Sequence, residues 1–257
     1  MDRLLELAGV TVRFGGVVAV AGLDLQVHEG EIFSLIGPNG AGKTTVFNII
    51  TGVYQPVEGS LTLGGRSLRG RKPHQVTRLG VARTFQNLRL FGNMSVLENV
   101  LVGTDARHRT GIPGAVLGLP THRAEERGGR AMALELLALV GIEQLADDAA
   151  SNLSYGDQRR LEIARALATE PRLLLLDEPT AGMNPPEKAA LQTLVRAIRD
   201  RGITVLLIEH DMSVVMTISD RVAVLDFGRK IAEGLPAEVR TDPAVITAYL
   251  GAPTDAA

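Results

Sequence analysis

Cysteine and tryptophan are absent from this chain of 257 residues, and aromatic residues make up only 4% of it. Without cysteine there is no disulfide framework and no thiolate metal site, so a reducing compartment fits the composition. The first seven residues carry two acids and no long apolar stretch, and we therefore expect no signal peptide there.

A long apolar run is also missing. The most apolar loop stretch, residues 112–119, is far shorter than the roughly 20 residues that span a bilayer. Neither sign of charge is in large excess, because 27 basic and 29 acidic residues leave a formal net charge of −2. We expect a chain that does not cross a membrane by itself, and its overall charge gives no reason to expect nucleic acid as a partner.

Hydrophobic residues make up 45% of the chain, which is enough for a well-buried core. In the second half, strand patterns at 173–176, 203–208 and 222–225 alternate with helical patterns at 186–200 and 211–219. This alternation predicts βαβ units and a parallel sheet. The four leucines at 173–176 are typical of a strand that is buried on both faces.

The first half predicts strands at 4–10, 24–27, 31–36 and 60–63, with a helix at 43–51. Between about residues 88 and 168 the pattern becomes helical, so we predict a helical subdomain inserted into the sheet. The expected α/β architecture therefore has a mostly parallel sheet, a small antiparallel edge near the N-terminus and this inserted subdomain.

The segment that follows the strand at 31–36 matches the phosphate-loop pattern, in which two glycines flank four residues and Lys and Thr follow. Glycines let the backbone curl so that several N–H groups face a phosphate, and the next helix adds its positive N-terminal end. An ordinary glycine-rich turn would not need the whole pattern between a strand and a helix. The predicted nucleotide contacts are Gly37, Pro38, Asn39, Gly40, Ala41, Gly42, Lys43, Thr44 and Thr45.

Two acids end the leucine-rich strand. Asp177 would lie beside the phosphate loop, where it could hold Mg²⁺ together with the hydroxyl of Thr44, while Lys43 offers its charge to the phosphates. Glu178 would then be within reach of the attacking water as a general base. Two acids after an apolar run are otherwise only a solvated strand end, and the phosphate loop is what favours the catalytic interpretation.

A third segment, residues 153–158, opens a predicted helix. Ser154 is an N-cap candidate with Asp157 three residues later, and Gly156 leaves the first turn open to a phosphate. By itself this pattern indicates a capped helix and nothing more.

Taken in order, the phosphate loop, the helix start at 153–158 and the strand ending in Asp-Glu resemble the ATP-binding subunits of ABC transporters. The resemblance extends over residues 4–251 and implies a phosphate-loop NTPase core formed by 1–87 and 169–236, a helical subdomain at 88–168 and a short tail at 237–257. It implies ATP and Mg²⁺ as cofactors. Residues 153–158 resemble the family's signature segment, departing at Tyr155 and Asp157, and Ser154, Gly156 and Gln158 are the nucleotide-facing residues.

Three further positions are assigned by the resemblance alone. Gln86 matches the glutamine that senses Mg²⁺ and the γ-phosphate, and His210 matches the switch histidine beside the catalytic glutamate. Phe14 resembles the aromatic residue that stacks on adenine, although a core position is the alternative for an aromatic side chain. Asn184 departs from the family, because most members have an Asp there.

The family resemblance also implies partners. Two ATPase chains, copies or paralogues, would pack head to tail so that each signature segment closes the other chain's site, and transmembrane permease subunits would receive the motion. The segments around Arg83, Tyr155, Ala181 and Ile208, together with the 103–123 insertion and the ending at 248–251, are similar to importers of branched-chain amino acids. That similarity implies a solute-binding protein and a place at the cytoplasmic face of the inner membrane.

Three alternatives remain open at this stage. The chain could be the ATPase of a lipid or lipopolysaccharide exporter, which has similar length and motifs. It could be a soluble ABC-type ATPase acting on ribosomes or nucleic acid, although it shows no second cassette and no basic stripe. It could also be a binding module without hydrolysis, which the presence of Glu178 and His210 disfavours.

Overall fold

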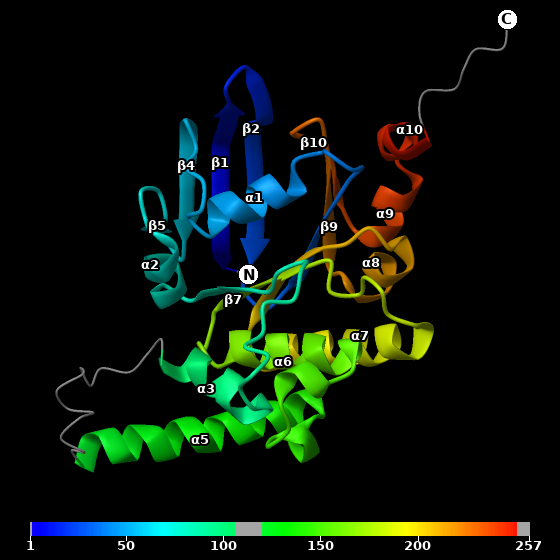
Figure 1. Cartoon of the computed structure of the whole chain (residues 1–257). Coiled ribbons are helices and arrows are strands. Elements are labelled where there is room, and N and C mark those ends of the chain that lie inside the picture. Colours follow the sequence, from blue (N-terminus) through cyan, green and yellow to red (C-terminus); the bar gives the residue numbers. More distant parts are fainter. Residues whose placement is uncertain (1, 106–119, 251–257) are drawn as a thin grey trace, which may run out of the picture. The chain divides into compact units, whose positions relative to one another are not determined.

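The computed structural model describes residues 2–105 and 120–250. The chain forms two compact units, the first comprising Met1–Val81 with Arg172–Ala257 and the second comprising Ala82–Pro171. Most of the 103–123 insertion, and Gly251 of the 248–251 segment, lie outside the described residues. Each unit is described by itself, and Figure 1 labels many of their helices and strands.

The first unit contains an antiparallel sheet in the order β2-β1-β4-β5. Its first two strands form a hairpin that is much longer than the pattern at 4–10 and 24–27 predicts. The outer part of this hairpin contains exposed glycines between buried valines, and its register shifts near Gly9 and Gly22 mark bulges rather than turns. The strands are β1 (Arg3–Phe14), β2 (Val17–His28), β4 (Glu58–Leu63) and β5 (Arg66–Ser67).

The larger sheet carries the parallel strands. The five strands that lie wholly in the first unit follow the order β10-β9-β3-β8-β7, and only β10 is antiparallel to its neighbour. Every residue of β3, β7 and β8 is buried, as a sheet covered on both faces requires. The strands are β3 (Ile32–Ile36), β7 (Leu173–Asp177), β8 (Thr204–Ile208), β9 (Arg221–Asp226) and β10 (Arg229–Gly234).

Six helices of the described chain belong to this unit. Those predicted at 43–51, 186–200 and 211–219 are present within a few residues of the expected ends. The tail predicted after 236 is helical as far as it is described, in two short helices that each begin at a proline. The helices are α1 (Lys43–Ile50), α2 (Pro73–Arg78), α7 (Pro185–Asp200), α8 (Met212–Ile218), α9 (Pro236–Thr241) and α10 (Pro243–Leu250).

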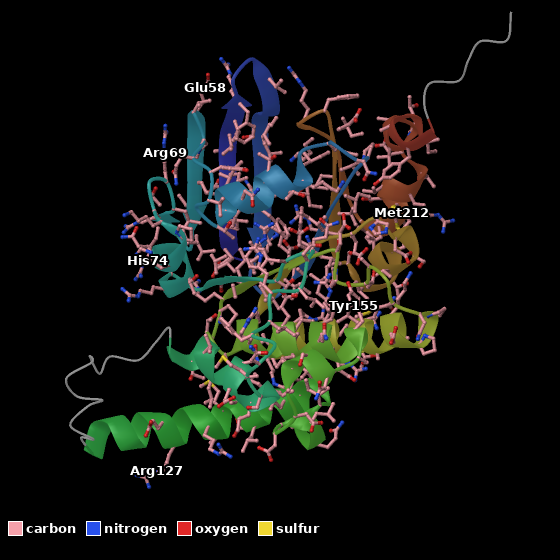
Figure 2. The ribbon with its side chains drawn as sticks, in the orientation of Figure 1. Glu58, Arg69, His74, Arg127, Tyr155 and Met212 are labelled. Carbon is pink, nitrogen blue, oxygen red and sulfur yellow. The ribbon has the colours of Figure 1, made fainter. Side chains whose placement is uncertain are left out.

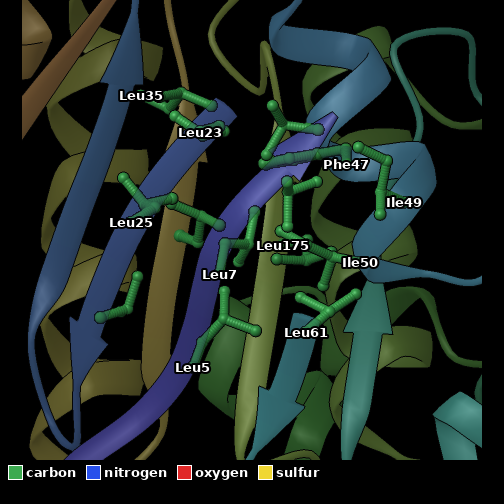
Figure 3. Packing of buried hydrophobic residues seen from close by; sticks show 14 of the residues in the cluster. Leu5, Leu7, Leu23, Leu25, Leu35, Phe47, Ile49, Ile50, Leu61 and Leu175 are labelled. Atoms are coloured by element: carbon green, nitrogen blue, oxygen red, sulfur yellow. The ribbon is translucent and has the colours of Figure 1, made fainter. Parts of the chain in front are cut away.

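The core of the first unit joins its two sheets. Apolar side chains of β1 and β2 pack together with those of α1 and of the parallel strands, as Figure 3 shows for Leu7, Leu25, Phe47 and Leu175. All four of these side chains are at most 1% exposed. The phosphate loop is therefore followed directly by a helix, α1, whose position is fixed by packing in the core.

In the described part of the second unit, three helices form a bundle and contact one another in every pair. They are α3 (Val96–Asp105), α5 (Pro120–Val140) and α6 (Tyr155–Leu167). The strand β6 (Val81–Arg83) leads the chain into it. Gly103 allows α3 to lie close to α6, because a Cβ there would stand 2.4 Å from the carbonyl oxygen of Arg165. The two units divide at 81/82 and 171/172, whereas the subdomain boundaries at 88 and 168 stay a prediction.

No helix among residues 2–105 and 120–250 combines the length and the apolar character that a membrane crossing needs.

Replacing Leu175, at the centre of β7, should show how far the parallel sheet depends on its buried strands. Leu175→Ala leaves a cavity where the side chain is 0% exposed, so we expect the free energy of unfolding to fall by about 2–5 kcal/mol in urea denaturation. Leu134→Ala is the matched control, because Leu134 is 40% exposed and alanine favours helix. Equal losses in the two variants would contradict the proposed core.

Candidate functional site

The phosphate loop takes a backbone path that two of its glycines make possible. Gly37 has φ +149°, and a Cβ there would stand 2.1 Å from the carbonyl oxygen of Leu225. Gly42 has φ +101°, and its Cβ would stand 2.7 Å from the carbonyl oxygen of Ala19. Neither position has space for a side chain, so the loop lies tightly against β9 and β2 and keeps its curl.

The ammonium group of Lys43 lies within this curl. Its Nζ donates to the carbonyl oxygen of Gly37 at 2.7 Å and to that of Pro38 at 3.0 Å, and the residue is 8% exposed. Burial lowers the pKa of Lys43, while the negative charges of Glu178 and Asp177 act in the opposite direction. The structure thus brings the predicted phosphate-binding lysine and both predicted acids to one place.

The two acids follow β7 at the carboxyl edge of the parallel sheet. Asp177 is 3% exposed and pairs in register with Ile208 of β8. Glu178 has φ +47°, which is rare for a residue with a side chain, and its N–H donates to the carbonyl oxygen of Ile208 at 2.9 Å. The chain thus turns sharply at Glu178, a kind of outlier that is frequent at functional sites.

His210 comes from the next strand along the sheet. Its Nδ1 lies 3.7 Å from Oε2 of Glu178, and its side chain is 59% exposed whereas that of Glu178 is 22% exposed. The pair predicted from sequence is therefore adjacent in space, with the imidazole accessible and the carboxylate half-buried.

The donors near the phosphate loop suit a hard cation. A hydroxyl from Thr44 and a carboxylate from Asp177 are oxygen ligands of the kind that Mg²⁺ takes. No three His, Cys, Asp or Glu side chains converge into a metal cage anywhere in residues 2–105 and 120–250. Mg²⁺ is usually held by one or two protein ligands together with phosphate oxygens, so this donor set fits the ion.

The predicted adenine-stacking residue is on the surface. Phe14 is 44% exposed, which excludes the alternative of a core position. Its ring meets that of Tyr54 edge to face, with centroids 4.9 Å apart and planes at 71°. Tyr54 follows α1 and was not predicted from sequence, because nothing in its local pattern distinguishes it from an ordinary turn residue.

The second unit holds the remaining predicted contacts. Ser154 is the N-cap of α6, and its Oγ accepts from the N–H of Asp157 at 3.2 Å, as the capping pattern predicted. Gly156 is buried in the first turn. The amide of Gln158 donates to the carbonyl oxygen of Leu153 at 3.1 Å, so its side chain supports the same helix end. Figure 2 labels Tyr155, the first residue of this helix.

The side chain of Gln86 is exposed, but its backbone carbonyl is hydrogen-bonded to a buried side chain. The buried guanidinium of Arg159 donates to the carbonyl oxygens of Phe85, at 2.5 Å, and of Gln86, and pairs with Glu162 at 3.1 Å. Glu162 in turn accepts from the N–H of Phe85 at 3.2 Å. Burial raises the pKa of Glu162, opposed by the Phe85 hydrogen bond and by Arg159. The glutamine segment and α6 are therefore joined by a buried ion pair.

Sequence reasoning missed this Arg159–Glu162 pair and also the buried Glu209. The i, i+3 spacing of Arg159 and Glu162 suits a pair on one helix face, but only the fold shows that this face is inside. Asn184, the departure from the family, caps α7 by accepting from the N–H of Glu187 at 3.0 Å. An amide oxygen serves that cap as well as a carboxylate does.

Comparison with known proteins identifies the family. The model for "ABC transporter" matches residues 20–181, and the model for "Branched-chain amino acid ATP-binding cassette transporter" matches residues 229–254. The chain belongs to the ABC transporter family. Within it, the high-affinity branched-chain amino acid transport ATP-binding protein LivG of Salmonella typhimurium is 49% identical over 249 residues, which cover 96% of this chain and 98% of that protein.

Solved members of the family share the fold. A nucleotide-free ATP-binding cassette from an ABC transporter superposes with a TM-score of 0.85 at 31% identity, over 97% of this chain and 100% of that one. A dimeric cassette in a post-hydrolysis state with ADP and phosphate gives a TM-score of 0.76 at 27% identity, over 91% and 99%. The predicted α/β fold is confirmed, and the chain is an ATPase of this family.

Arg159→Met should destabilise the second unit strongly. The substitution leaves the carboxylate of Glu162 and the carbonyl oxygens of Phe85 and Gln86 without their buried partner, which costs about 3–5 kcal/mol when one half of a buried ion pair is removed. The measurement is urea denaturation followed by circular dichroism.

Arg160→Met is the matched control for that change. Arg160 neighbours Arg159 on the same helix, but it is half-buried and pairs with Asp157 at 3.6 Å. We expect a loss of less than about 1 kcal/mol there. If Arg160→Met cost as much as Arg159→Met, the buried pair would not be what fixes the glutamine segment.

Proposed function

We propose that this chain powers the import of branched-chain amino acids by hydrolysing ATP on the cytoplasmic face of the inner membrane. The observation that carries the proposal is the match to LivG over nearly the whole of both chains, together with the match of residues 229–254 to a model specific for branched-chain amino acid transporters. The exporter and nucleic-acid alternatives are not supported by either match.

In the proposed reaction, the loop from Gly37 to Gly42 and the ammonium of Lys43 bind the β- and γ-phosphates of ATP. Their donors are already oriented by the tight backbone path, so little rearrangement is needed when charge develops. Thr44, Thr45 and Phe14 add contacts to the phosphates and to adenine, with Tyr54 supporting the ring of Phe14.

Thr44, Asp177 and Gln86 are the proposed Mg²⁺ ligands. When bound, Mg²⁺ neutralises charge on the phosphate oxygens. Glu178 orients the attacking water and accepts its proton, and His210 holds the carboxylate of Glu178 in position from 3.7 Å. Glu178 follows the buried strand at a sharp turn, and its side chain is 22% exposed.

A second ATPase chain, either a copy or a paralogue, completes the proposed assembly. Ser154, Gly156 and Gln158 would contact the ATP that the partner chain holds, since they lie at the N-terminal end of α6, where the helix dipole favours a phosphate. The related cassette that was solved as a dimer supports such pairing. ATP would then favour the closed dimer, and loss of the γ-phosphate would favour its opening.

The other proposed partners are transmembrane permease subunits and a solute-binding protein, with no nucleic acid. The relatives are named as ATP-binding proteins of transport systems, which supports a permease partner. The solute itself would be recognised by the binding protein and the permease, because the ATPase site recognises only nucleotide.

Purification of the tagged chain from native membranes tests the proposal. We expect two multi-span subunits, a second ATPase and a binding protein that carries a branched-chain amino acid. Recovery with ribosomes or nucleic acid, or with a lipid-export permease, would contradict the import function and leave the ATPase chemistry standing.

The Glu178→Gln variant, purified in the same way, tests the catalytic assignment. The amide cannot accept the water's proton, so we expect turnover to fall by roughly a hundredfold or more while ATP still drives dimerisation. Steady-state phosphate release and size-exclusion chromatography measure the two effects. Phosphate release at the wild-type rate would show that Glu178 is not the base.

A further inference from the structure

Glu209 is a fully buried carboxylate that the proposed reaction does not use. It lies between the last residue of β8 and His210, and its side chain is 0% exposed. A carboxylate is expensive to bury unless it is well hydrogen-bonded or paired with a cation. Because Glu209 directly precedes His210, the proposed switch histidine, its hydrogen bonds show which backbone segments it holds beside that histidine.

The two oxygens of this carboxylate receive donors from different segments. Oε1 accepts from the backbone N–H of Thr180 at 2.9 Å and from its hydroxyl at 2.5 Å. Oε2 accepts from the backbone N–H of His210 at 3.1 Å and from that of Asp211 at 3.4 Å. One side chain thus ties the chain after β7 to the chain after β8.

These two segments carry the proposed catalytic pair. Thr180 comes two residues after Glu178, and His210 lies 3.7 Å from the Glu178 carboxylate. The side chain of His210 is 59% exposed, so packing does not fix its place. Its backbone is held instead, by the buried Glu209, and the same carboxylate also holds the segment that carries Glu178.

Stability alone does not account for such a residue. The ion-pair contact of Glu209 within the described chain is with Nδ1 of His210 at 3.9 Å, which is itself exposed. Apolar side chains of similar volume generally serve a core as well as a buried charge or better. An ion pair between Lys188 and Asp211, at 2.6 Å, also links the chain after β7 to the chain after β8. It lies nearer the surface than Glu209, so it would contribute little to stability.

We propose that Glu209 is a positioning residue for ATP hydrolysis, which holds the backbones of Thr180 and His210 at one carboxylate and so fixes the spacing between Glu178 and His210. This inference rests on the proposed roles of Glu178 and His210.

Glu209→Gln separates the two halves of this tie. A glutamine has one acceptor oxygen, so it can accept from the donors of Thr180 or from the N–H groups of His210 and Asp211, but not from both. Its amide nitrogen would face at least one backbone N–H on the other side. Thr180→Val removes the hydroxyl with little change in volume, and Thr180→Ser restores it.

The measurement is steady-state ATP hydrolysis by the purified full-length chain, with kcat and KM determined separately at a temperature where circular dichroism shows each variant folded. We expect Glu209→Gln to lower kcat by roughly tenfold to a hundredfold, with KM for ATP changed by less than about twofold. Thr180→Val should lower kcat by roughly threefold to tenfold, and Thr180→Ser should be within about twofold of wild type.

Glu31→Gln is the matched control. Glu31 is also buried, at 4% exposed, and its Oε1 accepts from the N–H of His28 at 2.6 Å, but it stands before β3, at the other end of that strand from the phosphate loop. We expect its kcat to be unchanged within about twofold. An equal fall in kcat in Glu31→Gln would show that any buried carboxylate has this effect and would overturn the assignment.

Wild-type kcat in folded Glu209→Gln, or a raised KM with unchanged kcat, would also overturn it. If Glu209→Gln does not fold, Thr180→Val decides, because an unchanged kcat in that variant overturns the inference and a fall restored by Thr180→Ser supports it. Turnover retained by Glu178→Gln would instead count against the proposed catalytic roles, so the two failures are distinguishable.

Discussion

The parallel pairing of β3, β8 and β7 is the constraint on which the functional site depends. All residues of these three strands are buried, and their carboxyl ends meet at one edge of the sheet. The phosphate loop follows β3, Asp177 and Glu178 end β7, and Glu209 and His210 follow β8. Residues more than 170 positions apart in sequence therefore come together because the strands that precede them share one hydrogen-bonded register.

A second feature, found within each unit separately, is the anchoring of backbone segments by buried charged side chains. The side chains of His210 and Gln86 are exposed, so packing does not fix them, and buried charged side chains anchor the backbones beside them instead. Glu209 holds Thr180 and His210 in the first unit, and Arg159 with Glu162 holds Phe85 and Gln86 in the second. Both anchors lie within a few residues of a group assigned to nucleotide chemistry, and both bind the backbone beside that group.

The sequence was sufficient for the features that local patterns encode. The leucine run predicted β7. The complete phosphate-loop pattern predicted the curved backbone that Gly37 and Gly42 allow, and the capping pattern predicted Ser154 as the N-cap of α6. Long-range contacts were not accessible in this way. The outer part of the β1–β2 hairpin was missed because its glycines and bulges interrupt the regular alternation of buried and exposed residues. Glu209 was missed because a single acid after a strand is ordinarily solvated. Whether such a residue is buried, and which residues it contacts, is set by the tertiary structure and cannot be read from the local sequence.

A crystal structure of the Glu178→Gln chain with ATP and Mg²⁺ would test the central claim most directly, because the claim is that one sheet edge assembles the site. The account predicts the triphosphate in the loop between Gly37 and Lys43, with the γ-phosphate beside residue 178 and His210 and the backbones of His210 and Thr180 still joined through Glu209. A γ-phosphate that lies away from the ends of β7 and β8, or a Glu209 carboxylate released from both segments, would contradict it.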